Sequence, residues 1–278
     1  MDSPQHTPEV DVLRLDGRVA VITGAAGGIA GAIVDRVLQL GARVALLDID
    51  DAGLARLERR HAAVRERVLA LHCDVASEAD VSASARRVLD EFGGCDLLVN
   101  NAGVLPRATS IEAQSVDDWD RSMDVNVRGV FLCTQHFGRH MLARGAGSIV
   151  NIASIGAEAP NASPPYGAAK AAVIAFTRQT AIEWGPRGVR ANSVSPGFIR
   201  TPLSEHMYAG TDLAEVRAGM VPLRRLGTTL EIAHVAAFLL STGAAYVNGQ
   251  DLQVDGGFLM TPLMHAQAPA VQYGGQRV

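Results

Sequence analysis

The chain has 278 residues, of which 48% are hydrophobic and 19% are charged, and its formal net charge is −4. A chain of this length and composition can bury a sizeable core, which excludes a disordered protein. Because the sequence has no basic run and no apolar stretch of about 18 residues, we expect no nucleic-acid partner and no membrane association.

Short apolar runs rich in β-branched residues alternate along the chain with longer segments of helical periodicity. Seven of the runs are predicted to be buried strands, since they lack strict polar alternation: 18–23, 42–48, 67–75, 96–101, 148–154, 189–195 and 251–254. Helices are predicted near 28–40, 51–63, 77–92, 117–143, 166–184 and 229–241. This alternation predicts a parallel sheet with right-handed crossovers and helices on both faces.

No linker, repeat or low-complexity segment interrupts this pattern. We therefore expect one α/β domain over residues 14–258, with an N-terminal tail at 1–13 and a C-terminal tail at 259–278 that are mobile or docked. The first residues, MDSPQHTPEVD, include early acidic residues and no apolar core, so they lack the pattern of a secretory signal.

The three cysteines, Cys73, Cys95 and Cys133, are odd in number and widely spaced. Their spacing does not match a zinc site, so we expect no metal. Reduced thiols of this kind are typical of a cytoplasmic protein.

A glycine-rich turn, TGAAGGIAGAI, follows the first predicted strand and opens the first predicted helix. Glycines let the backbone turn tightly and approach a pyrophosphate, which the N–H groups and dipole at a helix N-terminus can bind. An ordinary tight loop between a strand and a helix is the alternative. An acid about 20 residues further on favours a dinucleotide site, and Asp48 lies 24 residues after Gly24.

Two aspartates at predicted strand ends are candidates for binding the adenosine part of such a dinucleotide. Asp48 ends the second strand, where its carboxylate can accept hydrogen bonds from both ribose hydroxyls. Asp74 follows the third strand and could accept one from the adenine amino group. A simple cap or turn aspartate is the alternative at both positions, and for Asp74 taken alone it is the favoured one.

A single lysine, Lys170, stands among the 25 basic Lys and Arg side chains of the sequence. Tyr166 precedes it by four positions, so both side chains leave one face of the predicted helix at 166–184. Tyrosine titrates near pH 10, and a nearby ammonium lowers that pKa. Lysine is a compact point charge on a flexible stem, which the wide planar fork of arginine cannot replace.

Taken together, the motifs resemble those of the classical short-chain dehydrogenase/reductase family over about residues 15–258. The family's T-G-x-x-x-G-x-G pattern is matched up to its last position, where the chain has Ala30. Three further segments match family motifs: NNAG at 100–103, PGFIRT at 196–201 and VDGG at 254–257. The resemblance implies a single Rossmann-type doubly wound domain with a seven-stranded parallel sheet and helices on both faces.

The resemblance also implies an NAD-dependent oxidoreductase that transfers a hydride between a secondary alcohol, or its ketone, and nicotinamide. Its four catalytic side chains match Asn126, Ser154, Tyr166 and Lys170. By this resemblance Tyr166 is the general acid/base, Ser154 stabilises charge on the reacting oxygen, Lys170 holds the nicotinamide ribose, and Asn126 anchors a water for proton relay. Ser154 and Tyr166 are 12 positions apart, one fewer than expected for close relatives.

NAD is expected rather than NADP, because Asp48 would repel the 2′-phosphate. At about 4 Å and an effective dielectric constant near 20, each unit of like charge costs roughly 4 kcal/mol before screening. NADP-preferring relatives place a basic residue at positions that are Gly27 and Ile49 here, and both are uncharged. The residues expected to bind the cofactor are Gly24, Gly28, Ile29, Asp48, Asp74, Val75, Asn101, Tyr166, Lys170, Ile199 and Thr201.

Two other functions stay open: a non-catalytic dinucleotide sensor, and an epimerase or dehydratase that shares the Tyr and Lys pair. The substrate is expected to depend on residues 203–223, together with 104–107 and 155–163. Met207, Tyr208 and Met220 in the first segment indicate either an apolar pocket or ordinary core packing. The family resemblance and the alanines of the 166–184 helix further predict a homotetramer.

Overall fold

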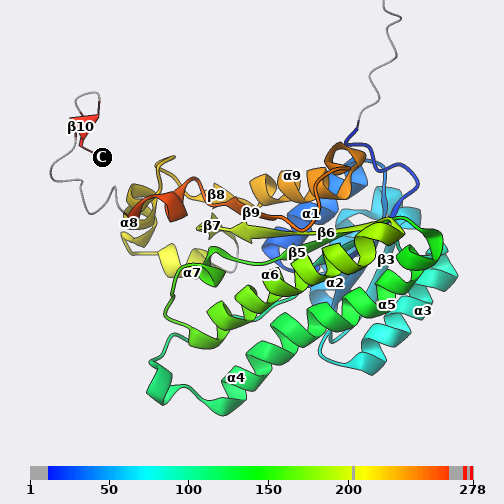
Figure 1. Cartoon of the computed structure of the whole chain (residues 1–278), viewed down its shortest axis with the longest axis horizontal. Coiled ribbons are helices and arrows are strands. Elements are labelled where there is room, and N and C mark those ends of the chain that lie inside the picture. The colour runs from blue at the N-terminus through cyan, green and yellow to red at the C-terminus, as the bar shows by residue number, and fades with distance from the viewer. Residues whose placement is uncertain (1–11, 202–203, 263–271, 274–275, 278) are drawn as a thin grey trace, which may run out of the picture.

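The structure is a computed structural model that describes residues 12–201, 204–262, 272–273 and 276–277 (Figure 1). Most of both predicted tails, residues 1–11, 263–271, 274–275 and 278, lies outside these residues. The inner parts are docked rather than free. The carbonyl of Val12 accepts hydrogen bonds from the hydroxyl of Thr242 and the amide of Gly243 (3.0 and 3.2 Å), and Thr261 is buried.

Seven strands form one sheet in the order β3-β2-β1-β4-β5-β6-β9, and every neighbouring pair is parallel. The predicted sheet is therefore confirmed. Its strands are β1 (Val19–Thr23), β2 (Arg43–Asp48), β3 (Val68–His72), β4 (Leu97–Asn100), β5 (Gly147–Ile152), β6 (Val189–Pro196) and β9 (Asp251–Val254). The first half of the chain builds outward from β1 in one direction and the second half in the other, as in doubly wound folds.

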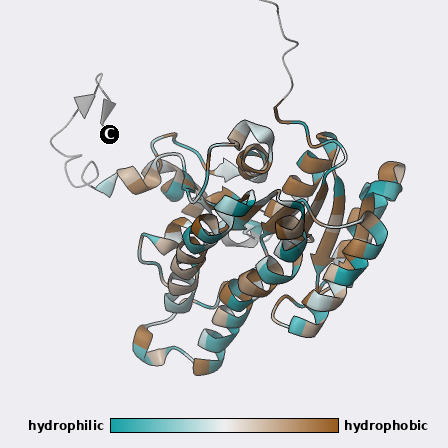
Figure 2. Ribbon diagram, turned by 45° about the vertical axis from the view of Figure 1, so that its right-hand side comes forward, coloured by the Kyte–Doolittle hydropathy of each residue, from teal (hydrophilic) through white to brown (hydrophobic). Residues whose placement is uncertain are grey.

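Helices cover both faces of this sheet, and each face has its own apolar core. Figure 2 shows hydrophobic strands in the middle and helices that carry both hydrophobic and hydrophilic residues. One face packs against α1 (Gly28–Gln39), α2 (Asp51–Arg60) and α9 (Thr229–Leu240). The other packs against α3 (Glu78–Phe92), α5 (Gly129–Arg144) and α6 (Pro164–Trp184). None of the described helices is long and apolar enough to cross a bilayer.

The predicted helix at 117–143 is interrupted. It consists of α4 (Val116–Met123), a π-helical turn at Asp124–Arg128, and α5. A π turn inserts one residue into the helical repeat and often marks a functional site. Here it turns the buried side chain of Asn126 toward the loop that follows β4.

Strand β3 ends at His72, whereas the prediction ran to residue 75. The carboxylate of Asp74 accepts a hydrogen bond from the amide of Ala76 (2.9 Å), and the hydroxyl of Ser77 caps α3. These local bonds favour a turn over a continued strand.

Several short elements were not predicted. Between β6 and α9 lie β7 (Ile199–Arg200), α7 (Glu205–Tyr208), α8 (Leu213–Met220) and β8 (Gly227–Thr228), and β7 pairs with β8. A hairpin of β10 (Gln272–Tyr273) and β11 (Gln276–Arg277) follows near the C-terminus. A kinked 3₁₀ segment occurs at Ala62–Arg67, and single 3₁₀ turns occur at Ile111–Ala113, Ile155–Ala157, Gly185–Arg187, Thr242–Ala244 and Phe258–Met260.

The contact between α5 and α6 predicts unequal effects of replacing two helical glycines. A Cβ atom at Gly138 would lie 2.3 Å from the ring of Trp184, so Gly138→Ala should destabilise the fold by about 1–3 kcal/mol through overpacking. A Cβ atom at Gly31 meets nothing within 4 Å, so Gly31→Ala should stabilise α1 by about 0.5–1 kcal/mol. Urea unfolding of both variants measures the two changes, and equal changes would contradict this packing.

Candidate active site

The candidate site lies at the carboxyl ends of the central strands, around the point between β1 and β4 where the strand order reverses. Ligands of open α/β sheets bind at such a switch point, because the loops on its two sides diverge. The glycine-rich turn after β1, the NNAG segment after β4, Ser154 after β5 and the start of α6 all come to this end of the sheet.

The glycine-rich turn packs directly against the loop after β4. Gly24 has a φ of +61°, and a Cβ atom there would lie 2.7 Å from the Cα atom of Ala102. Only glycine fits such a position. The hydroxyl of Thr23 accepts hydrogen bonds from the amides of Asn101 and Ala102 (3.0 and 3.1 Å). The side chain of Asn101 donates to the carbonyls of Thr23 and Gly24, both at 3.2 Å.

The first turn of α1 supplies the helix N-terminus that the sequence predicted. Gly27 is its cap and Gly28 its first residue, and neither has a side chain that would cover the terminal N–H groups. Ile29 packs against the core. The departure from the family pattern, Ala30, is fully buried among the core side chains of the α1 face.

Asp48 lies beside this turn. One carboxylate oxygen accepts a hydrogen bond from the amide of Ala26 within the turn, and the other accepts one from the amide of Asp50, both at 2.9 Å. The carboxylate of Asp48 is therefore fixed beside the glycine-rich turn, and its binding of a ribose stays a prediction.

Other acids surround Asp48. Asp50 pairs with Arg56 (3.2 Å), and Asp51 bonds the ring of His72, the register neighbour of Asp48 on β3 (2.8 Å). The bond from Asp51 raises the pKa of His72 above its usual value. The region around Asp48 thus carries excess negative charge.

Asp74 and Val75 take structural positions in the next loop. The carboxylate of Asp74 closes the turn to Ala76, so the alternative of a turn aspartate is met in the structure. Val75 is buried, and a Cβ atom at Gly129 would lie 2.8 Å from its methyl group.

The ammonium of Lys170 is buried beside the ring of Tyr166. Lys170 is only 4% exposed, and its Nζ donates to the carbonyl of Ile152 (2.8 Å) while lying 5.7 Å from the centroid of the Tyr166 ring. Burial lowers the pKa of Lys170 to about 8, because desolvation disfavours its charged form.

Tyr166 and Ser154 meet above Gly156. A Cβ atom at Gly156 would lie 3.4 Å from the Ser154 hydroxyl and 3.6 Å from the Tyr166 ring. Burial raises the pKa of Tyr166, and a hydrogen bond from Ser154 partly opposes that rise. The sequence had led us to expect a lowered pKa through Lys170. In the structure the pKa of Tyr166 is raised instead, because desolvation of the phenol is the largest influence on it.

The short spacing between Ser154 and Tyr166 is absorbed by one compact loop. Asn161 accepts a hydrogen bond from the amide of Ser163 (2.9 Å) and donates one to the carbonyl of Gly156 (3.4 Å). Two prolines at the start of α6 then set its first turn.

Asn126 is fully buried, and its side chain holds the loop after β4 through hydrogen bonds. Its amide nitrogen donates to the carbonyl of Val104 (2.9 Å) and the hydroxyl of Ser122 (3.2 Å), and its oxygen accepts from the amide of Val104 (3.1 Å). A Cβ atom at Gly103 would lie 2.6 Å from the Asn126 oxygen and 3.5 Å from Lys170 Nζ. Asn126 and Lys170 therefore flank one glycine.

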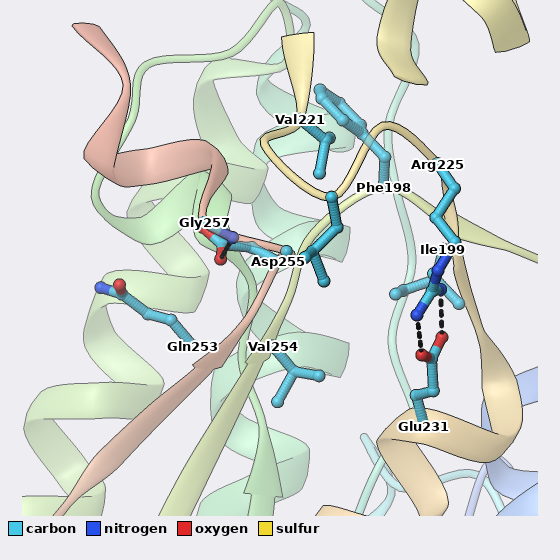
Figure 3. A pocket seen from close by; sticks show the side chains of 12 residues that line it. Phe198, Ile199, Val221, Arg225, Glu231, Gln253, Val254, Asp255 and Gly257 are labelled. Atoms are coloured by element: carbon cyan, nitrogen blue, oxygen red, sulfur yellow. Dashed lines mark hydrogen bonds and ion pairs between the residues drawn. The ribbon is translucent and has the colours of Figure 1, made fainter. Parts of the chain in front are cut away.

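Ile199 and Thr201 lie in the strand and turn that follow β6. Ile199 is buried in β7, and Thr201 exchanges hydrogen bonds with Ser204 (2.9 and 3.1 Å). Ile199 also lines a cavity of about 400 Å³, bounded by the ion pair of Arg225 with Glu231 and by the segment after β9 (Figure 3). None of the four predicted catalytic residues lines this cavity, so we do not equate it with the reaction site.

The segment expected to contact substrate packs through aromatic side chains. Tyr208 is buried, and its hydroxyl accepts a hydrogen bond from Arg217 (2.8 Å), whose guanidinium lies 4.9 Å from the Phe198 ring centroid. Met220 is exposed, and the side chain of Met207 lies outside the described residues. Tyr208 therefore belongs to local packing rather than to an open pocket.

The sequence analysis missed a row of buried polar side chains beneath the site. Asn100 on β4 donates to Thr134 on α5 (3.1 Å) and to Asn151 on β5 (2.8 Å), and Asn151 donates to Thr177 on α6 (2.8 Å). Asparagine within two apolar strands was the signal that could have revealed it, since buried amides need partners.

These residues fit a dinucleotide. Gly24 keeps the turn free of side-chain atoms, the bare N-terminus of α1 can bind a pyrophosphate, and Asp48 can accept ribose hydroxyls. Lys170 and Tyr166 lie across the switch point, where the other end of such a ligand would reach.

Comparison with known proteins agrees with this site. A family model described as enoyl-(acyl carrier protein) reductase matches residues 24–259. D-threitol dehydrogenase from Mycolicibacterium smegmatis is 41% identical over 246 residues, covering 88% of this chain and 94% of that protein.

Two solved structures have the same fold. Gluconate 5-dehydrogenase from Burkholderia cenocepacia, in complex with NADP and tartrate, superposes with a TM-score of 0.85 at 36% identity, covering 90% of this chain and 98% of that one. A short-chain type dehydrogenase/reductase from Mycobacterium marinum gives 0.84 at 32% identity, covering 89% and 98%. The chain belongs to the short-chain dehydrogenase/reductase family, whose members of this kind are oxidoreductases acting on CH–OH groups.

Proposed function

We propose that this protein is an NAD-dependent dehydrogenase of small secondary alcohols, with Tyr166 as its general acid/base. The observation that carries the proposal is the meeting of the Tyr166 and Ser154 side chains at Gly156, with the buried ammonium of Lys170 beside them. Relatives named as dehydrogenases of D-threitol and galactitol support an alcohol substrate. A sensor protein would not need this buried pair of titratable groups.

In oxidation, Tyr166 accepts the proton of the alcohol hydroxyl, and in reduction it donates that proton to the carbonyl oxygen. Ser154 donates a hydrogen bond to the same oxygen and stabilises its developing negative charge. A bound nicotinamide supplies the acceptor for the hydride. Lys170 would hold its ribose, and Asn126 would keep the loop around Gly103 in place. The pyrophosphate would lie at Gly24 and Gly28, Asn101 would line the cofactor, and Ile199 and Thr201 would meet the carboxamide and the diphosphate.

We propose NAD over NADP because acids surround the adenosine end. Asp48, Asp50 and Asp51 lie together there, and Arg56 is already paired with Asp50. A 2′-phosphate would add negative charge to this cluster. The gluconate 5-dehydrogenase was solved with NADP, so the proposal of NAD rests on the local charge of this chain and not on the shared fold.

We also propose a cytoplasmic homotetramer. The three cysteines are free and buried, which suits a reducing compartment. Large apolar side chains are exposed on the helices of one face: Val116, Trp119, Phe131 and Ile182. Subunit contacts through these helices would cover them, and a monomeric mass in light scattering would exclude the assembly.

The tyrosine and the lysine should both be essential. Tyr166→Phe should lose roughly 10²–10⁴-fold in kcat, the usual contribution of general acid–base catalysis, while NAD binding is retained. Lys170→Arg keeps the charge but should also lose most activity, because the guanidinium is wider than the buried site that holds the ammonium. Steady-state kinetics on a panel of alcohols measures both, and wild-type turnover in either variant would show that the assigned roles are mistaken.

Removing the Ser154 hydroxyl should shift the pH profile. The hydrogen bond from Ser154 lowers the pKa of Tyr166, so Ser154→Ala should raise that pKa further. Tyr166 must be deprotonated to accept a proton, so the rising limb of kcat/KM for oxidation should move to higher pH. Ser163→Ala is the control, because the buried Ser163 hydroxyl has no hydrogen-bond partner in the described part of the chain. An unmoved limb in Ser154→Ala would contradict the assignment.

The charge of Asp48 should set cofactor preference. Wild type should prefer NAD, and Asp48→Asn should raise the ratio of kcat/KM with NADP to that with NAD by at least about tenfold, equivalent to about 1.4 kcal/mol. Asp74→Asn is the matched control, because any contact with adenine is common to both cofactors and leaves the ratio unchanged. A wild-type enzyme that uses NADP as well as NAD would refute the role of Asp48.

A further inference from the structure

Four buried polar side chains form a directed row of hydrogen bonds across the sheet. Asn100 donates to Asn151, Asn151 donates to Thr177, and Thr177 donates to the carbonyl of Val173 one turn earlier on α6 (2.8, 2.8 and 2.7 Å). Asn100 also donates to Thr134 on α5 (3.1 Å). All four side chains are at most 2% exposed, so water does not compete for these bonds.

Thr177 lies on the same face of α6 as the catalytic pair. Tyr166, Lys170 and Thr177 are separated by four and seven residues, which places Thr177 about 10 Å along the helix from Lys170. The helix is thereby attached to β5 at two points along its length. Thr177 accepts a hydrogen bond from the side chain of Asn151, and Lys170 donates one to the carbonyl of Ile152. Ser154 follows two residues after Ile152.

Apolar packing alone defines the position of α6 along β5 only weakly. Between Tyr166 and Phe176 the helix contains one glycine and five alanines, whose small side chains interlock little with a neighbouring surface. In this part of the helix Val173 and Ile174 belong to a separate core cluster with four buried members, the others being Val130 and Ala153, while Ala181 near the end of the helix joins the larger core. Buried amides are more demanding, because each must find its partner at a fixed distance.

We propose that Asn151 and Thr177 are positioning residues for the reaction: their hydrogen bond fixes α6 on β5 at the height where the Tyr166 hydroxyl meets Ser154. The inference rests on the catalytic roles proposed for Ser154 and Tyr166. A misplacement of about 1 Å at a reacting group can cost on the order of 10²-fold in rate, so a small shift of α6 would be visible in kcat.

The chain offers a matched pair of substitutions for the test. Thr177→Val removes the hydroxyl at nearly constant shape and leaves the Asn151 amide without its acceptor. Thr180→Val makes the same change one turn later on the same helix, where the buried hydroxyl donates to the carbonyl of Phe176 (2.9 Å) and no bond from β5 is involved. Thr177→Ser keeps the oxygen and serves as the rescue.

Thr177→Val should lower kcat for alcohol oxidation at least about tenfold, leave the KM for NAD unchanged, and move the rising limb of the pH profile upward as the bond from Ser154 to Tyr166 lengthens. Thr180→Val should retain wild-type kcat and pH profile, and Thr177→Ser should restore both. A purely structural role would change stability without moving the pH limb. Equal kinetics for the two valine variants, or failure of serine to rescue, would overturn the proposal.

Crystal structures of the variants test the same proposal without a measurement of activity. The distance between the Ser154 and Tyr166 hydroxyl oxygens should increase in Thr177→Val and stay constant in Thr180→Val, and equal distances would overturn the inference. A wild-type protein that oxidises no alcohol would refute the proposed function alone, since this distance still decides the positioning. If Thr177→Val does not fold, Thr177→Ala and Thr180→Ala form the same comparison.

Discussion

A buried ammonium must find hydrogen-bond acceptors or lose its proton, and much of the site is arranged around that requirement at Lys170. The carbonyl of Ile152 supplies the acceptor, which ties α6 to the end of β5. Gly103 lies between this ammonium and Asn126, and a Cβ atom there would collide with the Asn126 oxygen at 2.6 Å while making ordinary contact with Lys170 Nζ at 3.5 Å. The lowered pKa of Lys170 is the consequence of this burial.

Polar contacts connect the two ends of the site through the sheet itself. The side chain of Asn101 donates a hydrogen bond to the glycine-rich turn. Its neighbour Asn100 donates the first hydrogen bond of the row that reaches α6, and both residues lie at the end of β4. Asn100 ends β4 and Asn101 follows it directly, so two adjacent residues make contacts on different sides of the strand end. The glycine-rich turn and α6 are thereby connected through β4, the turn by partly buried hydrogen bonds and the helix by fully buried ones.

The seven strands could be predicted to within a few residues because their runs are mostly apolar, rich in β-branched residues, and lack a strict polar alternation. The four proposed catalytic residues were named from the family resemblance, and the structure gathers their side chains at one sheet end. The π turn at Asn126 could not be predicted, since it depends on contacts with Val104 far along the chain. Nor could the raised pKa of Tyr166, because the degree of burial of a phenol is invisible in a local pattern. The short elements β7, α7, α8 and β8 could not be predicted either, because their sequences show no sustained helical or strand periodicity.

The solitary lysine gives this protein an unusual experimental property. Chain grown on nitrogen-labelled lysine carries its label at one residue only, and that residue is the buried ammonium donating to Ile152. A single resonance then reports the protonation state and the surroundings of the reaction centre, free of overlap and without any substitution. No other side chain carries a primary amine. Amine-reactive dyes and cross-linkers should therefore react chiefly at the amino terminus, because the ammonium of Lys170 is buried.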